Sequence, residues 1–274
     1  MYKNKLYWAV YLLLLTNLWA CGDNSNPNPN PTVDNPNPAY PTDTLRSYYY
    51  PLKDLEDGLV YEYIYASNQQ TAYYWFFKQV KDEAGNWNLV GTRYGANFET
   101  EALTRERVYP NGTAYELYQF VVLDTPTQKD RIYPHQISEP TAFPFEIPAK
   151  QGQTYRFQSQ FNLPPDMTMN YRFTRDRQFS KFLDFDYEQK KQPAVEFIGY
   201  DYLTLNDTTN GGYFTLDSAD MKEIFVQNIG LVYSERKAPS GQTVVWTLKG
   251  RYDMDSFLRK IPEKVLPKQR MPQK

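Results

Sequence analysis

Apolar and polar residues alternate with a period of two through much of the segment 45–258. Successive side chains of a strand point to opposite faces, so this period predicts half-buried β-strands. Short turns separate the predicted strands and no long helical period intervenes, which indicates an antiparallel meander. The predicted strands cover residues 59–65, 72–80, 87–91, 98–109, 115–123, 154–161, 167–173, 195–205, 212–216, 224–234 and 242–252.

The turns and the few helical segments agree with this fold class. Asn111 and Gly112 join two alternating runs, and an Asn-Gly pair tolerates the positive φ angles of a tight hairpin. Helical character is limited to 217–225, which begins with an aspartate able to cap a helix, and to 179–192, whose aromatic residues also fit a strand. We therefore expect one mainly β body.

The N-terminus reads as an export signal. Lys3 and Lys5 precede the apolar run 6–15, which is too short to cross a bilayer and is typical of a signal peptide. The tetrapeptide Leu18-Trp19-Ala20-Cys21 resembles the lipobox of bacterial lipoproteins, although Trp19 occupies a position that usually holds a small residue. The resemblance implies that residues 1–20 are removed and that Cys21 carries a triacyl membrane anchor. The alternative is a secreted protein whose single cysteine lies here by chance.

The segments that flank the body have no pattern of regular structure. Residues 21–44 contain the dipeptide Asn-Pro five times, and proline both removes an amide donor and pushes its predecessor to extended angles. This composition predicts a semi-rigid tether of polyproline character. Residues 259–274 contain six basic side chains, one acidic side chain and three prolines, which predicts a basic disordered tail.

Composition excludes several functional classes. One cysteine and one histidine can form neither a disulfide framework nor a Cys/His zinc site. With 30 basic and 32 acidic residues, the chain lacks the basic excess of nucleic-acid binders. His135 is the only histidine, so any His-dependent triad would have to use it. The sequence contains no Gly-x-Ser-x-Gly elbow to supply the nucleophile. The Pro-rich surroundings of His135 predict a surface loop. We therefore predict no catalytic residue, no metal and no cofactor.

Aromatic residues make up 17% of the chain and supply the candidate binding surface. Tyr and Trp suit half-buried sheet faces, so cross-strand aromatic ladders are the structural explanation. A stacking surface or an aromatic-lined groove is the functional one. The densest run must place rings on both faces of its strand, and its members are the first candidates for ligand contact: Tyr73, Tyr74, Trp75, Phe76 and Phe77.

Two charged patterns offer further candidates. Asp184 and Asp186 would share one strand face, and paired carboxylates can serve a glycosidase or hold a cation. Arg172, Arg175 and Arg177 alternate with aromatic residues in the strip 172–181. We interpret this strip as a solvated sheet edge protected by charge, with a surface for anionic lipid or polysaccharide as the alternative.

Two short stretches of the body resemble uncharacterised envelope lipoproteins of Bacteroidota. The first is Tyr49-Tyr50-Pro51-Leu52, followed by Gly58 and by Tyr61-Glu62-Tyr63, and the second is Asn228-Ile229-Gly230-Leu231-Val232-Tyr233. The resemblance implies an antiparallel, strongly curved meander sheet, half-barrel or sandwich-like, with little helix and no known catalytic residues. It also implies an outer-membrane location through the anchor on Cys21.

These observations predict a membrane-anchored, non-enzymatic envelope lipoprotein with a binding or structural role. A hollow sheet would indicate a lipid or another apolar ligand. A filled core with an exposed aromatic face would indicate a glycan or an envelope-protein partner. The alternative function is a carbohydrate-active hydrolase that uses paired carboxylates.

Overall fold

A computed structural model describes residues 45–124, 129–147, 152–163, 169–207 and 212–261. In chain order its elements are the 3₁₀ helices η1 (Arg46–Tyr48) and η2 (Leu52–Leu55), the strands β1 (Leu59–Tyr65), β2 (Thr71–Lys81), β3 (Trp87–Gly95), β4 (Thr100–Tyr109), β5 (Gly112–Asp124), β6 (Lys129–Pro134), β7 (Gln136–Pro144), β8 (Thr154–Asn162), β9 (Met169–Tyr187), β10 (Lys190–Asp207), β11 (Gly212–Val226), β12 (Gly230–Lys237) and β13 (Thr243–Tyr252), and the helix α2 (Met254–Leu258).

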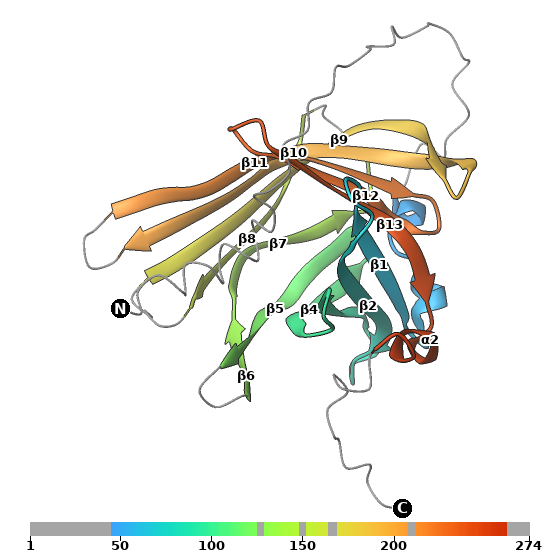
Figure 1. Cartoon of the computed structure of the whole chain (residues 1–274), viewed down its shortest axis with the longest axis horizontal. Helices are drawn as coiled ribbons and strands as arrows, with labels where there is room; N and C mark the ends of the chain where they lie inside the picture. Colours follow the sequence, from blue (N-terminus) through green and yellow to red (C-terminus); the bar gives the residue numbers. More distant parts are fainter. Residues whose placement is uncertain (1–44, 125–128, 148–151, 164–168, 208–211, 262–274) are drawn as a thin grey trace, which may run out of the picture.

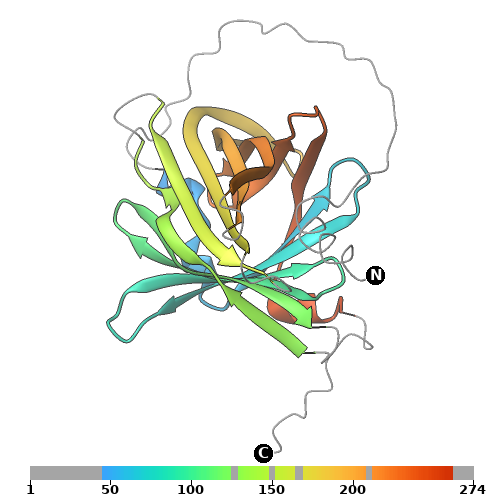
Figure 2. The ribbon, with the colours of Figure 1, turned by 90° about the vertical axis from the view of Figure 1, so that its left-hand side faces the viewer.

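All thirteen strands belong to one antiparallel sheet in the order β4-β3-β2-β1-β13-β12-β11-β10-β9-β8-β7-β5-β6. An additional pairing between β4 and β5 joins the two sides of this sheet, so twelve strands close into a barrel (Figures 1 and 2). The predicted curved antiparallel meander with little helix is confirmed. The sheet closes because β5 is shared between β4 and the C-terminal part of β7.

The two ends of the barrel are built differently. Turns of an antiparallel meander alternate between the ends, so 66–70, 96–99 and 238–242 lie at one end, which we call the open end. The other end is closed by the segment 45–58, which we call the plug. The plug is hydrogen-bonded to two separate connections of the barrel: Leu45 N–H donates to the Phe145 carbonyl after β7, and Asn228 N–H, between β11 and β12, donates to the Ser47 carbonyl.

Three consecutive tyrosines give the plug its hold on the barrel. Tyr48, Tyr49 and Tyr50 are all buried. The Tyr49 ring lies 5.1 Å from that of Phe143, and the Tyr50 ring lies 4.3 Å from that of Phe77. Buried aromatic pairs of this kind add stabilisation beyond the area that they remove from water. The main hydrophobic core therefore sits between the plug and the surrounding strands.

The predicted strand 224–234 is wrong, because a turn divides it. β11 ends at Val226 and β12 begins at Gly230. Between them Asn228 adopts a φ of 60°, and Gly230 follows with a φ of 101°. Both angles lie in the left-handed region, where strand geometry cannot continue.

The two segments for which a helix was the alternative form strands instead. Residues 217–225 belong to β11, and 179–192 form the β9–β10 hairpin. Both segments belong to long strands that pair with their neighbours over many residues, and this pairing outweighs their weak local helix preference. Residues 129–144 gave no strand prediction, yet they form β6 and β7, which are mostly exposed and so lack a clear alternation.

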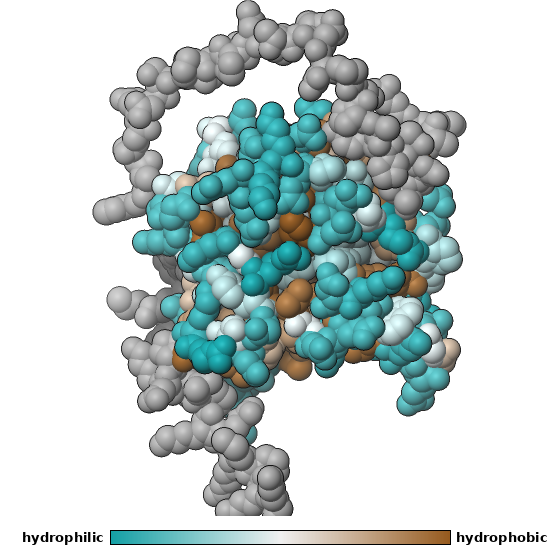
Figure 3. Space-filling view, turned by 90° about the vertical axis from the view of Figure 1, so that its right-hand side faces the viewer, coloured by the Kyte–Doolittle hydropathy of each residue, from teal (hydrophilic) through white to brown (hydrophobic). Residues whose placement is uncertain are grey.

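The helix α2 covers part of the outer surface of the barrel. The Asp253 carboxylate caps it by accepting from Ser256 N–H at 2.6 Å. Lys260 then forms an ion pair with Glu62 at 2.7 Å, so the described body extends to Ile261. From the side that carries α2 and the plug, hydrophilic residues cover most of the surface between small apolar patches (Figure 3).

Several predicted features lie outside the described residues. These are the signal peptide 1–20, the tether 21–44 with its candidate lipidation site Cys21, and the tail from 262 onward. None of the helices in the described ranges is long and apolar enough to cross a membrane.

Candidate ligand cavity

A cavity of about 810 Å³ occupies the barrel between the plug and the open end. Its walls include residues from the open-end turns, such as Gln70, Asn97 and Gln242, so the cavity reaches that end. Its inner limit is formed by Tyr49 and Tyr50 of the plug. The volume falls within the range of sites that enclose small organic ligands.

One wall of the cavity is apolar and aromatic. A cluster separate from the main core forms it, with Phe161, Leu163 and Leu203 buried and Phe120 and Phe173 packed against them. These residues come from β5, β8, β9 and β10 and from the residue after β8, and they are close to the open end. A ligand with an apolar body would bury its surface on this wall.

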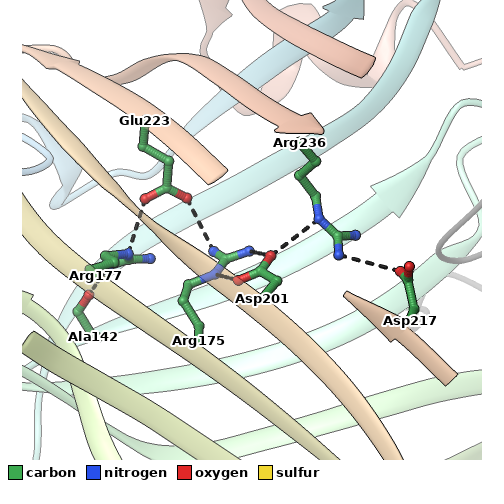
Figure 4. A network of polar contacts seen from close by, with 7 residues as sticks. All are labelled: Ala142, Arg175, Arg177, Asp201, Asp217, Glu223 and Arg236. Atoms are coloured by element: carbon green, nitrogen blue, oxygen red, sulfur yellow. Dashed lines mark hydrogen bonds and ion pairs between the residues drawn. The ribbon is translucent and has the colours of Figure 1, made fainter. Parts of the chain in front are cut away.

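The wall of the cavity also carries a network of charged side chains (Figure 4). Arg175 on β9 makes two hydrogen bonds of 2.8 Å to the Asp201 carboxylate on β10. Its third nitrogen lies 3.1 Å from Glu223 on β11. Arg177 lies 3.0 Å from Glu223, and it also donates to the Ala142 carbonyl.

Arg236 on β12 extends the network. Its Nε lies 3.2 Å from the Asp201 carboxylate, and one terminal nitrogen lies 3.5 Å from Asp217 on β11. Four neighbouring strands therefore contribute to a single network. The register of these adjacent strands brings the side chains together on one face, and closure of the sheet makes that face the interior of the barrel.

Neighbouring arginines hold the Asp201 carboxylate in its charged form. Burial by itself would raise the pKa of Asp201, but the Arg175 guanidinium beside it, assisted by Arg236, lowers that pKa below its usual value. The same carboxylates favour the cationic form of Arg175. Asp201 and Arg175 therefore form a charged pair at neutral pH.

The accessible part of this network that lines the cavity is cationic. Asp201 and Glu223 keep only 1% and 3% of their side chains accessible, whereas Arg175 keeps 27% and Arg236 keeps 16%. All four residues line the cavity. The carboxylates thus lie behind the guanidinium groups, which are the surface that a ligand would meet.

A second polar group separates the plug from the cavity. Glu106 is buried and accepts hydrogen bonds from the Tyr49 hydroxyl at 2.6 Å and from the Thr113 hydroxyl at 2.8 Å. Burial raises the pKa of Glu106 in spite of these donors. The contact ties the plug to β4 and β5 at the base of the cavity.

The position predicted for His135 is wrong. It does not lie in a surface loop but lines the cavity, in the single-residue connection between β6 and β7. Its ring stacks on Phe161 at 4.3 Å, and its Nδ1 lies 2.9 Å from the Ser159 hydroxyl. Burial lowers the pKa of His135 to about 3, so the ring is neutral at physiological pH. Its other ring nitrogen has no hydrogen-bond partner among the described residues, so no carboxylate completes a triad with His135 and Ser159.

The five aromatic candidates on β2 separate by face. Tyr73, Trp75 and Phe77 line the cavity. Tyr74 and Phe76 point outward and pack in the cluster that contains Phe257 of α2. The run therefore has rings on both faces, as its length requires, and only its odd-numbered members can contact a ligand inside the barrel.

The arginine strip does not form a solvated sheet edge. β9 is an interior strand of the sheet, because it pairs with β8 on one side and with β10 on the other. Arg175 and Arg177 on this strand line the cavity. Arg172 instead lines a shallow groove on the outer surface. The strip thus divides by face, just as the aromatic run of β2 does.

The paired carboxylates do not face the cavity. Asp184 and Asp186 are exposed near the plugged end of β9. Neither lines the cavity, so this pair does not provide the cleft that a glycosidase requires. Within the described ranges no three Asp, Glu, His or Cys side chains form a cluster suited to a metal ion.

Comparisons with known proteins give a distant likeness. No family model matches the chain, and no curated protein matches it. Two crystal structures are similar in shape. A candidate lipoprotein from Parabacteroides distasonis shares 8% identity, with a TM-score of 0.43 over 73% of this chain and 95% of its own. A candidate exported protein with a YmcC-like fold from Bacteroides fragilis shares 9% identity, with a TM-score of 0.47 over 74% of this chain and 98% of its own.

The sequence did not identify the residues that complete the charged network around Arg175 and Arg177. Asp201, Glu223 and Arg236 lie on three different strands, and nothing in their local sequence marks them as partners. A usable signal exists on β9, where Arg175 and Arg177 share the face of Phe173 and Phe179. Charged residues in phase with buried aromatic residues indicate an ion pair inside the fold.

Proposed function

We propose that this protein is a non-enzymatic lipoprotein of the cell envelope that binds a small ligand with an apolar body inside its barrel. The cavity of about 810 Å³ is the observation that carries this proposal. A filled core would have pointed to a partner on the outer surface. The barrel is instead filled at the plugged end and hollow toward the open end.

The aromatic wall supports an apolar ligand over a glycan. Phe161, Phe173, Leu163 and Leu203 present hydrocarbon surface without hydroxyl or amide groups. Sugars are recognised by stacking combined with many hydrogen bonds, whereas this wall favours the burial of apolar surface without hydrogen bonds. Trp75, Tyr73 and Phe77 of β2 extend the aromatic lining elsewhere in the cavity.

The anchor completes the proposal. Residues 1–20 would be removed as a signal peptide, and the acylated Cys21 would hold the protein at the outer membrane. The Asn/Pro-rich tether 21–44 would keep the barrel away from the bilayer surface, at up to about 3 Å per residue. A ligand-binding barrel at this place would carry or sense an amphiphile of the envelope.

A matched pair of substitutions tests the cavity. Val244 lines it and Val245 does not, although the two residues are adjacent on β13 and similarly half-buried. We expect Val244→Trp to weaken binding of the neutral dye N-phenyl-1-naphthylamine at least tenfold, because the indole occupies part of the cavity beside Arg236, which faces Val244 across β12 and β13. Val245→Trp should bind like the wild type. Fluorescence titration of the dye measures both affinities.

Native mass spectrometry of protein taken gently from its own envelope provides the second readout. A stoichiometric small molecule, lost in Val244→Trp and kept in Val245→Trp, would support the proposal. A protein of bare sequence mass that also fails to bind the dye would overturn it.

A further inference from the structure

We propose that the ligand is an anionic amphiphile whose acidic group contacts Arg236 and Arg175 in the interior of the barrel. The inference rests on the proposed function and names the class of ligand. The common chemistry is an oxyanion, either carboxylate or phosphate, attached to an apolar body. The evidence is the arrangement of the charged network relative to the cavity.

The guanidinium groups are held in place before a ligand arrives. Asp201 binds Arg175 through two hydrogen bonds of 2.8 Å and also pairs with Arg236. The Asp201 carboxylate is almost completely buried, so its role is to orient the arginines. Preorganised donors bind an anion more strongly because less freedom is lost on binding.

The donors that face the cavity are not all used. Within the described residues, the second terminal nitrogen of Arg236 has no hydrogen-bond partner, since Nε pairs with Asp201 and the other terminal nitrogen approaches Asp217 only at 3.5 Å. Figure 4 draws no contact from this nitrogen to either carboxylate. An oxyanion there would receive charge-assisted hydrogen bonds in a site sheltered from bulk water.

The surrounding surfaces suit the rest of such a molecule. Phe173 lies two residues before Arg175 on the same face of β9, and Leu203 lies two residues after Asp201 on β10. The apolar wall thus continues directly from the cationic network toward the open end. A single acyl chain could run along it, with its acidic group innermost.

The acidic residues of the cavity do not cancel this preference. Glu101 is paired with Arg93 at 2.9 Å on β3, across the barrel from the network. Glu106 lies at the base, where it accepts from two hydroxyl groups. Glu99 belongs to the β3–β4 turn at the open end. None of these carboxylates belongs to the Arg175–Arg236 network.

The test compares three ligands that share one chain. Dodecanoic acid, dodecyl phosphate and dodecanol are titrated below their aggregation limits against N-phenyl-1-naphthylamine bound to the full chain carrying Cys21→Ser, prepared without detergent at pH 8. We expect the acid, the phosphate or both to displace the dye at concentrations at least tenfold lower than the alcohol. The stronger of the two anions identifies the headgroup.

Three variants locate the preference. Arg236→Gln should weaken anion binding by about tenfold to a hundredfold, as expected for loss of a charge-assisted contact, and should leave dodecanol unchanged. Arg156→Gln, which removes an exposed arginine of the outer surface, should leave all three ligands unchanged. Asp217→Asn removes a carboxylate that competes for Arg236 and should tighten anion binding, which keeps the test decisive if Arg236→Gln does not fold.

Equal affinity for the alcohol and both anions would overturn this inference while leaving the proposed function intact. The inference would also fail if Arg236→Gln weakened all three ligands equally, or if Asp217→Asn had no effect on the anions. If the dye and all three ligands failed to bind the wild-type chain, the proposed function would fail together with the inference.

Discussion

At the scale of single residues, the most demanding feature is the charged interior. Removing ions from water costs several kcal/mol each, and an interior ion pair seldom repays this cost through stability alone. Arg175, Asp201 and Glu223 offset this cost through the hydrogen bonds and ion pairs that they form with one another. Such a network is more easily explained by a ligand that needs oriented guanidinium groups than by folding stability.

His135 provides a residue-scale prediction because it is the only histidine in the chain. Its ring is buried among Tyr118, Phe120 and Phe161, which lowers its pKa from 6.5 to about 3. As the pH falls below 6.5, the unfolded chain binds a proton at this position before the folded protein does. The contribution of His135 to stability is therefore complete above pH 6.5 and is lost progressively toward pH 3.

NMR titration of the single histidine ring should give a pKa far below 6.5 in the folded protein. His135→Phe retains the aromatic packing and should flatten the dependence of the free energy of unfolding on pH between about 6.5 and 4. The slope is the readout, since the lost bond to Ser159 lowers stability at every pH. A folded-state pKa near 6.5, or an unchanged slope in the variant, would contradict the assignment.

At the scale of elements, the plug decides which part of the barrel stays hollow. Tyr49 and Tyr50 fill the plugged end and contact strands on several sides. Gly230 at the start of β12 makes this approach feasible, because a Cβ there would meet the Tyr50 ring at 2.5 Å. The short loop before β12 is thus shaped by the plug as well as by its own turn.

Substitution of two glycines distinguishes the effect of backbone strain on stability from the effect of packing against the plug. Gly230 and Gly241 both have positive φ angles, of 101° and 87°, but no atom lies within 4 Å of a Cβ built on Gly241. Gly241→Ala should therefore cost about 1 kcal/mol of unfolding free energy through backbone strain. Gly230→Ala should cost about 1–3 kcal/mol more, because the methyl group also displaces Tyr50.

Chemical denaturation of both variants measures this difference. Equal destabilisation by the two substitutions would show that the plug adapts without cost. Packing of Tyr50 would then no longer explain why β12 begins with glycine.

At the scale of the whole molecule, the structure is a closed barrel with one filled end and one hollow end. Closure leaves no free edge along most strands, which protects a long sheet from pairing with other chains. It also encloses polar side chains that would be solvated in an open sheet. A tether at the N-terminus would let this body act near a membrane without inserting into it.

The anchor is testable on the whole protein. Cys21→Ser should move the protein from the membrane fraction to the soluble fraction and abolish incorporation of labelled palmitate, because no other cysteine can accept a lipid. The barrel should keep its melting temperature, since none of its strands includes residue 21. Retention in the membrane fraction without any label would show that another feature of the chain holds the protein there.

The sequence by itself determined the class of the fold. Alternation of period two on strands such as β1, which has the predicted bounds 59–65, depends only on neighbouring residues. The same local logic predicted rings on both faces of β2 and the tight turn at Asn111. It also predicted the signal peptide, the tether and the anchor at Cys21, and these predictions depend on composition and short motifs alone.

Only the tertiary structure decided the closure of the barrel, the plug and the cavity. The β1–β13 pairing and the Tyr50–Gly230 contact join residues far apart in the chain, and no local pattern specifies such contacts. Arg175 was open to a surface interpretation until its strand was placed between β8 and β10, with Asp201 opposite. Whether a charged side chain faces water or a cavity depends on how the sheet closes, and that is a property of all twelve strands together.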